Sequence, residues 1–382
     1  MFRDLPWRCV VAWVVTLTVC WSGVAGADTI ERTERHAVRV RILTRGLERP
    51  WSLAFLPDGR MLVTERSGRL RYVAADGSLD PTPISGLPAS VAERRQGGLH
   101  DVVLHPDFSR NRLVYLAYAG RGDGGYGTEL ARGRLDGHRL TGVTVLFRAL
   151  PKSFGGRHFG GRVVFDGKGH VFLTLGDRGN RPSAQDLGNH AGSVIRLTED
   201  GGVPRDNPFR SVAGARPEIY TLGNRNIQGA AIHPRTGELW THEHGPQGGD
   251  EVNIIRAGVN YGWPVITYGR NYGIGTRIGE GTHKDGLAQP LYQWTPSIAP
   301  SGMAFYEGDK FPGWRGNLLV GALAFRLLAR LEIDGERVLR EERMLEGTIG
   351  RIRDVRVGPD GYVYLLSDER NGVIARLEPA EG

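Results

Sequence analysis

One pattern recurs six times along this chain and constrains its fold more than any other feature. Each copy contains an alternating apolar run, a turn rich in Pro, Asp and Gly, and a second apolar run. Alternation with a period of two is typical of β-strands, and such a turn reverses the chain tightly between two of them. We therefore expect each copy to form the two inner strands of one sheet. The copies begin at Ser52, Asp101, Arg162, Gly229, Gly302 and Asp354.

A ring is the arrangement in which six small sheets leave only short strand edges exposed. The predicted fold class is therefore all-β, a six-bladed β-propeller of four-stranded antiparallel blades. The 56 glycines agree with the many tight turns that such a fold needs. A pair of β-sandwiches and a propeller with another number of blades are the alternatives. Uneven spacing between the copies leaves room for long loops on one face, where binding and catalytic residues usually lie.

The N-terminal segment is predicted to be a signal peptide over residues 1–27, followed by one catalytic domain over residues 28–382. It has a basic start, an apolar run over residues 9–21 and small residues before position 28. The run is short for a bilayer span, so a retained membrane anchor is the weaker alternative. Lipoprotein anchoring through Cys20 is less expected still, because Val19 stands where a small residue is usual. We expect a periplasmic or secreted protein with no transmembrane segment in its mature chain.

Charge and cysteine content exclude some functions. Both cysteines, Cys9 and Cys20, lie in the predicted signal peptide, so the mature protein would have no thiol nucleophile or thiolate ligand. The formal net charge is +7, but the arginines are spread along the chain without a Lys/Arg-rich run. Nucleic acid is therefore not an expected partner. Arginines gathered in one cleft would instead suit an anionic cofactor with several carboxylates.

The third copy places a histidine and an aspartate at the same end of a predicted hairpin. His158 enters the first strand and Asp177 leaves the second, so the hairpin brings their backbones together. A carboxylate beside an imidazole fixes its tautomer and raises its basicity, as a general base requires. The alternative is a histidine that is merely hydrogen-bonded at a loop edge.

Two arginine-containing segments suit an anionic, planar ligand. Arg225 and Asn226 lie in GNRNIQG, which places a cation among amide side chains. Arg351 and Arg353 are separated by one residue on a predicted strand, so both side chains point the same way and could clamp an anion. The alternatives are a surface loop for the first segment and a solvated basic pair for the second.

The segment THEHGPQGGDE over residues 241–251 is rich in carbonyl and carboxylate oxygens. Calcium prefers such oxygen ligands, so this loop is a candidate calcium site. Zinc or copper bound by His242 and His244 is the competing interpretation, but no third soft ligand is evident in the sequence.

Motifs in a fixed order give the sequence a resemblance to a known family. They are RQGGLHDVVLHPDF, HFGGRVVF, LTLGDRG, LGNRNIQGAAIHPRTGELW, EHGPQGGDEVN, NYGWP and TIGRIRDVRVGPDG. In this order the chain resembles the soluble aldose sugar and glucose dehydrogenases that depend on pyrroloquinoline quinone (PQQ), a family that includes sorbosone dehydrogenase-like proteins. The resemblance extends over nearly all of the predicted mature chain.

The resemblance implies a six-bladed propeller with PQQ flat in a central cleft and calcium at its quinone side. It implies oxidation of an aldose sugar at C1 to the lactone, with hydride transfer to PQQ. His158 then matches the general base, Asp177 the carboxylate that orients it, and Arg225 the cation that stabilises charge on the reduced cofactor. The electron acceptor, a quinone or a small redox protein, is left unidentified.

The resemblance also implies binding residues. The backbone carbonyls of Gly245 and Pro246 match ligands of the catalytic calcium, and Glu251 and Tyr261 match ligands of a structural calcium. The positions matching cofactor contacts are Gln96, Arg225, Asn226, Tyr272, Leu323, Ala324, Phe325, Arg351, Ile352 and Arg353.

Two departures point to one branch of that family. Arg157 stands before the base where the glucose enzyme has an acid, and Ala324 stands where it has a cofactor-binding lysine. Both differences favour the aldose branch with broader specificity.

Two other functions compete with the dehydrogenase. A calcium-dependent lactonase-type propeller hydrolase would need several side-chain carboxylates and amides around one ion, and it gives Arg225, Arg351 and Arg353 no role. A non-catalytic sugar-binding propeller would keep the fold without the chemistry, and the presence of His158 and Asp177 weighs against it.

Overall fold

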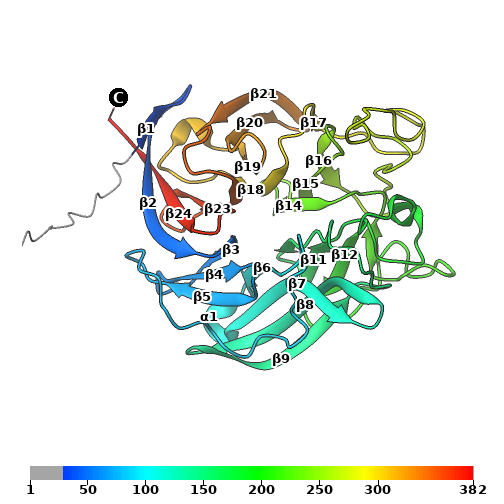
Figure 1. Cartoon of the computed structure of the whole chain (residues 1–382), viewed down its shortest axis with the longest axis horizontal. Helices are drawn as coiled ribbons and strands as arrows, with labels where there is room; N and C mark the ends of the chain where they lie inside the picture. The colour runs from blue at the N-terminus through cyan, green and yellow to red at the C-terminus, as the bar shows by residue number, and fades with distance from the viewer. Residues whose placement is uncertain (1–28, 382) are drawn as a thin grey trace, which may run out of the picture.

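The computed structural model describes residues 29–381, which form six antiparallel sheets arranged in a ring (Figure 1). The predicted all-β, six-bladed propeller is therefore confirmed. The predicted signal peptide and Cys20 lie outside the described residues. No helix formed by residues 29–381 has the length and hydropathy needed to cross a membrane.

We number the blades in chain order of their innermost strands. The first blade contains β3 (Pro50–Phe55), β4 (Met61–Glu65) and β5 (Arg69–Val73). The second contains β6 (Leu99–Leu104), β7 (Leu113–Gly122), β8 (Gly125–Asp136) and β9 (Arg139–Arg148). The third contains β10 (Val163–Phe165), β11 (His170–Thr174), β12 (Val194–Thr198) and β13 (Ile219–Thr221).

The remaining blades complete the ring. The fourth contains β14 (Ile227–Ile232), β15 (Leu239–Glu243), β16 (Asp250–Ile255) and β17 (Tyr292–Trp294). The fifth contains β18 (Pro300–Phe305), β19 (Leu318–Ala322), β20 (Leu328–Asp334) and β21 (Arg337–Met344). The sixth contains β22 (Ile352–Val357), β23 (Val363–Ser367), β24 (Gly372–Pro379), β2 (Ala37–Leu47) and β1 (Thr29–Arg32). The helical segments are the short helix α1 (Phe108–Asn111) and two 3₁₀ turns, Arg181–Gln185 and Pro312–Trp314.

Each of the six sequence copies forms the first two strands of one blade, as predicted. Two blades differ from the expected four strands. The first has three, because the segment after β5 carries Pro81, Pro83 and Pro88, which lack the N–H that a continuous ladder needs. Two isolated bridges, Leu70 with Ile84 and Val73 with Leu79, join the segment after β5 to that strand in place of a fourth strand.

The sixth blade has five strands because the N-terminal segment closes the ring. β2 pairs antiparallel with β24, from Val38 opposite Pro379 to Leu47 opposite Gly372, and β1 adds to the outer edge of β2. This pairing joins the two ends of the described chain in one sheet (Figure 1). It removes the exposed edge that an open ring would leave.

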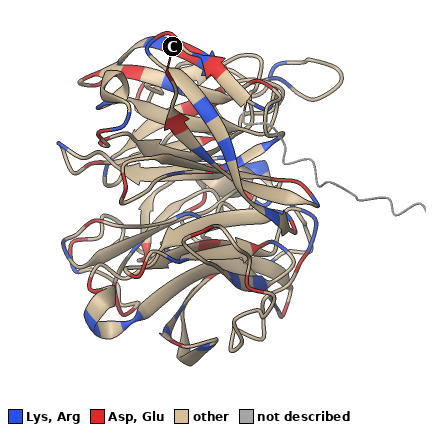
Figure 2. Cartoon of the chain, turned by 90° about the vertical axis from the view of Figure 1, so that its left-hand side faces the viewer, with Lys and Arg blue, Asp and Glu red and all other residues tan. Residues whose placement is uncertain are grey.

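Hydrophobic cores lie between neighbouring blades, since each sheet buries both of its faces. One core joins the sixth blade to the first through Leu53, Val63, Leu366 and Ile374, all of which are almost fully buried. The middle strands β4, β15, β19 and β23 are buried at every position for the same reason. Lys, Arg, Asp and Glu lie largely on turns and outer strands, with both signs interspersed (Figure 2).

The innermost strands instead carry a buried ionic network. Arg162 Nη1 lies 2.8 Å from Asp354 Oδ1, and Arg356 Nη2 lies 2.8 Å from Asp101 Oδ1. The Arg162 guanidinium also stacks over the Trp51 ring, 4.1 Å from its centroid. Because these charges are paired, they can be buried around the axis without a prohibitive desolvation cost.

Candidate active site

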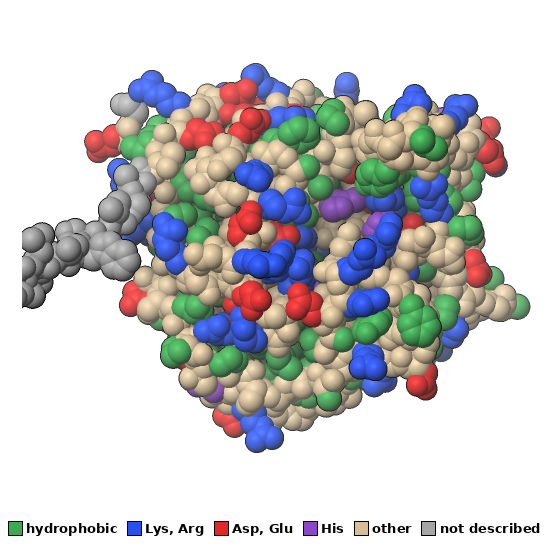
Figure 3. All heavy atoms as spheres, viewed as in Figure 1, with side chains coloured by type: hydrophobic (Ala, Val, Ile, Leu, Met, Phe, Trp, Pro, Cys, Tyr) green, Lys and Arg blue, Asp and Glu red, His purple; other side chains and the backbone are tan. Residues whose placement is uncertain are grey.

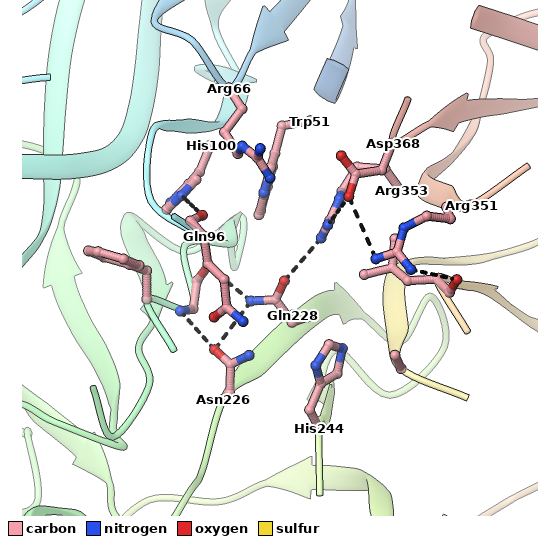
Figure 4. Close-up of a pocket in the computed structure, with 14 residues that line it drawn as sticks. Trp51, Arg66, Gln96, His100, Asn226, Gln228, His244, Arg351, Arg353 and Asp368 are labelled. Atoms are coloured by element: carbon pink, nitrogen blue, oxygen red, sulfur yellow. Dashed lines mark hydrogen bonds and ion pairs between the residues drawn. The ribbon is translucent and has the colours of Figure 1, made fainter. Parts of the chain in front are cut away.

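A cavity of about 270 Å³ lies at one end of the innermost strands, and all six blades contribute to it. Loops that enter the first strand and leave the second strand of each blade meet at this end. Basic and histidine side chains gather near the centre of this face (Figure 3). The lining residues are Trp51, Arg66, Gln96, His100, Phe159, Gly160, Asn226, Gln228, His244, Ala299, Leu323, Arg351, Arg353 and Asp368 (Figure 4).

The cavity is positively charged, because three guanidinium groups face one carboxylate. Arg353 Nη2 donates to Asp368 Oδ2 at 2.8 Å, and Arg351 Nη2 lies 3.9 Å from the same oxygen (Figure 4). Burial lowers the pKa of Arg66 and of Arg351, although Asp368 acts in the opposite direction. A bound anion would relieve this excess of buried positive charge.

Several buried nitrogens in the cavity have no hydrogen-bond partner among residues 29–381. They are Arg66 Nε, Arg353 Nε and His100 Nδ1. The His100 ring stacks on Trp51 with centroids 5.1 Å apart, which places a flat aromatic surface beside these nitrogens. Buried polar groups normally have partners, so unpaired nitrogens beside a flat wall fit a planar ligand with several carboxylates.

Amide side chains complete the polar wall. Gln228 Oε1 accepts a hydrogen bond from Arg353 Nη1 at 3.2 Å, and Gln228 Nε2 donates to Asn226 Oδ1 at 3.3 Å (Figure 4). Asn226 Oδ1 also accepts from the Gly160 N–H at 3.2 Å. This chain of bonds links the third, fourth and sixth blades and fixes the direction in which the amides face.

The predicted pair of His158 and Asp177 is present beside the cavity. His158 Nδ1 lies 2.6 Å from Asp177 Oδ1, and both residues are buried. The His158 backbone N–H donates to Gln96 Oε1 at 2.7 Å, which ties the pair to a cavity-lining residue. His158 has a φ of 56°, a left-handed conformation that is costly for a residue with a side chain.

The two residues differ in their charge state. Burial lowers the pKa of His158, and the positive charges of Arg225 and Arg157 act in the same direction. The hydrogen bond that His158 donates to Asp177 acts in the opposite direction. The pKa of Asp177 is lowered: burial opposes this, but the His158 and Gly179 hydrogen bonds outweigh it. At neutral pH the pair is therefore a neutral imidazole held by a carboxylate. Nε2 of His158 has no partner among the described residues, so it is the nitrogen available as a base.

The Arg225 side chain points toward backbone carbonyls at the end of β15. Its Nη1 donates to the His244 carbonyl at 2.8 Å and to the Gly245 carbonyl at 3.2 Å. Its guanidinium therefore borders a second, smaller cavity of about 10 Å³ rather than the large one. A space of this size holds a single water or ion.

Predicted calcium ligands border the small cavity. Gly245, Glu251 and Tyr261 are three of them, and Glu243 lies beside Glu251. Burial and the Glu243 charge raise the pKa of Glu251 well above its ordinary value, and burial also raises the pKa of Glu243. A buried carboxylate, Glu243, and a half-buried one, Glu251, that share a space this small fit one divalent cation.

Some of the expected ligand oxygens are already engaged. The Tyr261 hydroxyl donates to the Ile254 carbonyl at 2.6 Å, so its main-chain carbonyl is the oxygen left for a cation. The Pro246 carbonyl accepts from the Arg270 N–H at 2.9 Å. Within residues 29–381, no group of three or more His, Cys, Asp or Glu side chains is placed to hold a metal. The carboxylate cluster expected for a lactonase-type hydrolase is thus not found in the described part of the chain.

Five of the predicted cofactor residues do not line the large cavity, and Arg225 is one of them. Tyr272 is 64% exposed on the loop between β16 and β17, and Phe325 is 52% exposed. Ala324 is half-buried outside the lining set. The Ile352 side chain packs in the core between the fifth and sixth blades. Arg351 directly precedes β22 and Arg353 follows Ile352 on it, and of these three residues Arg351 and Arg353 line the cavity.

The other five predicted cofactor residues line the large cavity. They are Gln96, Asn226, Leu323, Arg351 and Arg353. The Leu323 carbonyl accepts from Arg351 Nη1 at 3.1 Å, which holds the arginine toward the opening.

Nine lining residues were not among the predicted cofactor or catalytic residues, and the repeat itself held a signal for six of them. Those six are Trp51, Arg66, His100, Gln228, His244 and Asp368, and the other three are Phe159, Gly160 and Ala299. Trp51, His100 and Gln228 directly precede the starts of their copies, as Arg353 does. Arg66, His244 and Asp368 directly follow the second strand of their blades. An alignment of the six copies would therefore have predicted that two positions of the repeat face the site: the residue before the start of each copy and the residue after its second strand.

A family model and a curated relative both match this chain, and they point to the same family. A family model described as glucose/sorbosone dehydrogenase matches residues 47–376. The aldose sugar dehydrogenase YliI of Escherichia coli K12 is 47% identical over 348 residues, which cover 90% of this chain and 93% of that protein.

Solved structures of aldose sugar dehydrogenases superpose on this chain. The soluble aldose sugar dehydrogenase of Escherichia coli in its apo-form superposes with a TM-score of 0.87 at 46% identity, covering 90% of this chain and 100% of that one. The PQQ-bound aldose sugar dehydrogenase of Streptomyces coelicolor gives a TM-score of 0.75 at 30% identity, covering 91% of this chain and 99% of that one.

Proposed function

This chain belongs to the glucose/sorbosone dehydrogenase family, and we propose that it oxidises aldose sugars at C1 to the lactone, using PQQ, calcium and His158 as general base. An aldose sugar dehydrogenase is what family membership supports. The single observation that carries the finer proposal is the buried His158–Asp177 pair beside a cavity lined by Arg66, Arg351 and Arg353.

Different side chains of the site have different roles in the proposed reaction. Arg66, Arg351 and Arg353 bind the carboxylates of the cofactor, and Asn226 and Gln228 set its orientation through their amides. His158 Nε2 takes the proton of the sugar C1 hydroxyl as the C1 hydride departs, and Asp177 stabilises the imidazolium that forms. Arg225 places a positive charge near developing negative charge. PQQ, when bound, supplies the two-electron acceptor for the hydride.

The test is reduction of an artificial electron acceptor by purified protein with glucose and other aldoses. We expect turnover only after both PQQ and calcium are added to the apo-protein. Absence of PQQ binding would refute the proposal. Tight binding with no turnover of any aldose would refute the substrate class. The physiological acceptor, a quinone or small redox protein, would be sought afterwards.

Activity should fall at acidic pH with a midpoint below 6.5. The base must be neutral, and burial holds the pKa of His158 below its ordinary value of 6.5. Since the protonated form is inactive, kcat/KM stays constant above that pKa and falls as the pH drops through it. The measurement is a pH profile of kcat/KM at saturating acceptor, with the melting temperature followed over the same range. A midpoint above pH 7 with an intact fold would contradict this charge state.

Calcium is proposed to bind at Glu251 and Tyr261, with the catalytic ion at the Gly245 and Pro246 carbonyls. The catalytic ion, at the Gly245 and Pro246 carbonyls, would act as a Lewis acid and as a template for the substrate. Support comes from the Glu243 and Glu251 carboxylates, which lie beside a cavity of ion size.

Calcium should therefore stabilise the protein through Glu251. A ligand present at a hundred times its Kd adds about 2.7 kcal/mol to the free energy of unfolding. We expect calcium to raise the melting temperature of the wild-type apo-protein, and Glu251→Gln to abolish most of that increase. Glu280→Gln, on an exposed loop, is the matched control and should respond as the wild type does. An equal response of Glu251→Gln would exclude this ligand.

We further propose that residues 1–27 are removed on export to the periplasm or the medium. Amino-terminal sequencing of the mature protein from its host tests this, and a start at Met1 would contradict it.

A further inference from the structure

Asp177 is held at both of its carboxylate oxygens, and the two sets of bonds differ in origin. Oδ1 accepts from His158 and from the Gly179 N–H, at 2.6 and 2.7 Å. Oδ2 accepts from Nε1 of Trp263 at 2.8 Å, its one bond among residues 29–381. The indole therefore fixes the half of the carboxylate that His158 does not touch.

This bond crosses between blades. Asp177 follows β11 of the third blade, whereas Trp263 lies on the loop after β16 of the fourth blade. The torsion that turns an aspartate carboxylate is broad, so a single-sided anchor would leave it free to rotate. A rotated carboxylate would lose the short bond to His158 Nδ1 and with it the orientation of Nε2.

Trp263 is itself rigidly placed. Its side chain is 4% exposed and packs with Ala184 and Ile278. Its backbone N–H donates to the Gly223 carbonyl at 2.8 Å, and its carbonyl accepts from Gln185 Nε2 at 2.7 Å. The guanidinium groups of Arg225 and Arg181 lie 5.4 and 5.5 Å from its ring centroid. The donor position is thus set by neighbours on two sides.

We propose that Trp263 is a positioning residue for the catalytic pair: its indole N–H locks the Asp177 carboxylate so that His158 Nε2 faces the sugar. The inference rests on the proposed function of His158. It extends the pair to a chain of three side chains from two blades, and it assigns a role to the tryptophan of NYGWP that the resemblance left without one.

Charged and titratable groups around the pair determine the pH signature. His158 is affected by Asp177, Arg225 and Arg157, and His244 lies close enough to interact with it. Asp177 is affected by His158, Arg225 and Arg178. Removing the indole N–H leaves all of these in place and makes the carboxylate more basic. The proton on His158 is then held more tightly, and the acidic limb of the activity profile moves upward.

The test compares Trp263→Phe with Trp294→Phe in the holoenzyme. Trp294 is a matched control, since it is equally buried and its Nε1 donates to Glu341 Oε1 at 3.0 Å, away from the cavity. For Trp263→Phe we expect kcat to fall about tenfold, KM for the sugar to change less than about twofold, and the acidic limb to shift upward by about half a pH unit, as loss of one hydrogen bond to a charged acceptor implies. Trp294→Phe should leave all three unchanged.

A double-mutant cycle identifies the route of the effect. In an Asp177→Ala background, Trp263→Phe should lower kcat by less than about twofold, the additivity error such a cycle carries. The same tenfold loss of kcat in the wild-type and Asp177→Ala backgrounds would overturn the proposal. So would a Trp263→Phe variant with wild-type kcat and an unchanged acidic limb of its pH profile. If Trp263→Phe does not fold, benzothienylalanine at position 263 keeps the ring shape and removes only the N–H.

A readout without turnover separates this inference from the proposed function. In the apo-protein, the proton between His158 Nδ1 and Asp177 should give a downfield nuclear magnetic resonance signal that moves in Trp263→Phe and not in Trp294→Phe. A signal unaffected by Trp263→Phe overturns the positioning role. A wild-type enzyme that oxidises no aldose overturns the function instead, whatever the signal does.

Discussion

Replacing His158 with glutamine should lower kcat for aldose oxidation about a thousandfold, within the hundredfold to ten-thousandfold range of general-base catalysis. Glutamine keeps the polarity and approximate size of the side chain but cannot accept the C1 hydroxyl proton. The reaction then depends on water as the base. PQQ affinity should change only a few-fold, because His158 is not among the residues that line the cofactor-sized cavity.

The measurement is steady-state turnover at saturating PQQ, calcium and acceptor, together with a PQQ titration followed by fluorescence. His138→Gln is the matched control, since His138 Nε2 also pairs with an aspartate, 2.7 Å from Asp80 Oδ2, but on the outer part of the second blade. It should leave kcat unchanged. A loss below tenfold in His158→Gln would remove this residue as the base.

Replacing Arg353 with methionine should weaken PQQ binding about a hundredfold or more. The side chain is buried in the cavity and donates to both Asp368 and Gln228. Removing one partner of a buried, hydrogen-bonded charge pair costs about 2–5 kcal/mol, and about 1.4 kcal/mol is a factor of ten in affinity. Methionine fills a similar volume, so the loss reflects charge rather than a new void.

A second variant separates binding from stability. Arg353→Met leaves Asp368 buried beside the more distant Arg351, so we expect a lower melting temperature as well. Arg353→Met combined with Asp368→Asn should recover much of that stability while PQQ affinity stays low. Arg256→Met, at an exposed ion pair with Glu336, controls for loss of any arginine. Isothermal titration of PQQ into each apo-protein decides the outcome, and wild-type affinity in Arg353→Met would exclude the cavity as the cofactor site.

Much of the fold followed from local patterns in the sequence. Strand periodicity and Pro-Asp-Gly turns act over a few residues, so the six copies predicted six blades and the two inner strands of each. A hairpin brings the ends of its two strands together, which predicted that His158 lies beside Asp177. Period-two alternation predicted that Arg351 and Arg353 lie on one face. Alternation also explains why Ile352, between them, belongs to the core.

What only the tertiary structure decided depends on residues that are distant in the chain. Ring closure brings Trp51 and Asp368 to one cavity, and the packing of the third blade on the fourth brings Trp263 to Asp177. Burial, which sets the charge states of His158 and Glu251, likewise arises from all the elements around a group. The sequence by itself therefore determined the repeated unit and its local pairs, because turn and strand preferences are short-range. The shape and electrostatics of the site came from closure of the ring, because desolvation and charge–charge interactions depend on distance in space rather than along the chain.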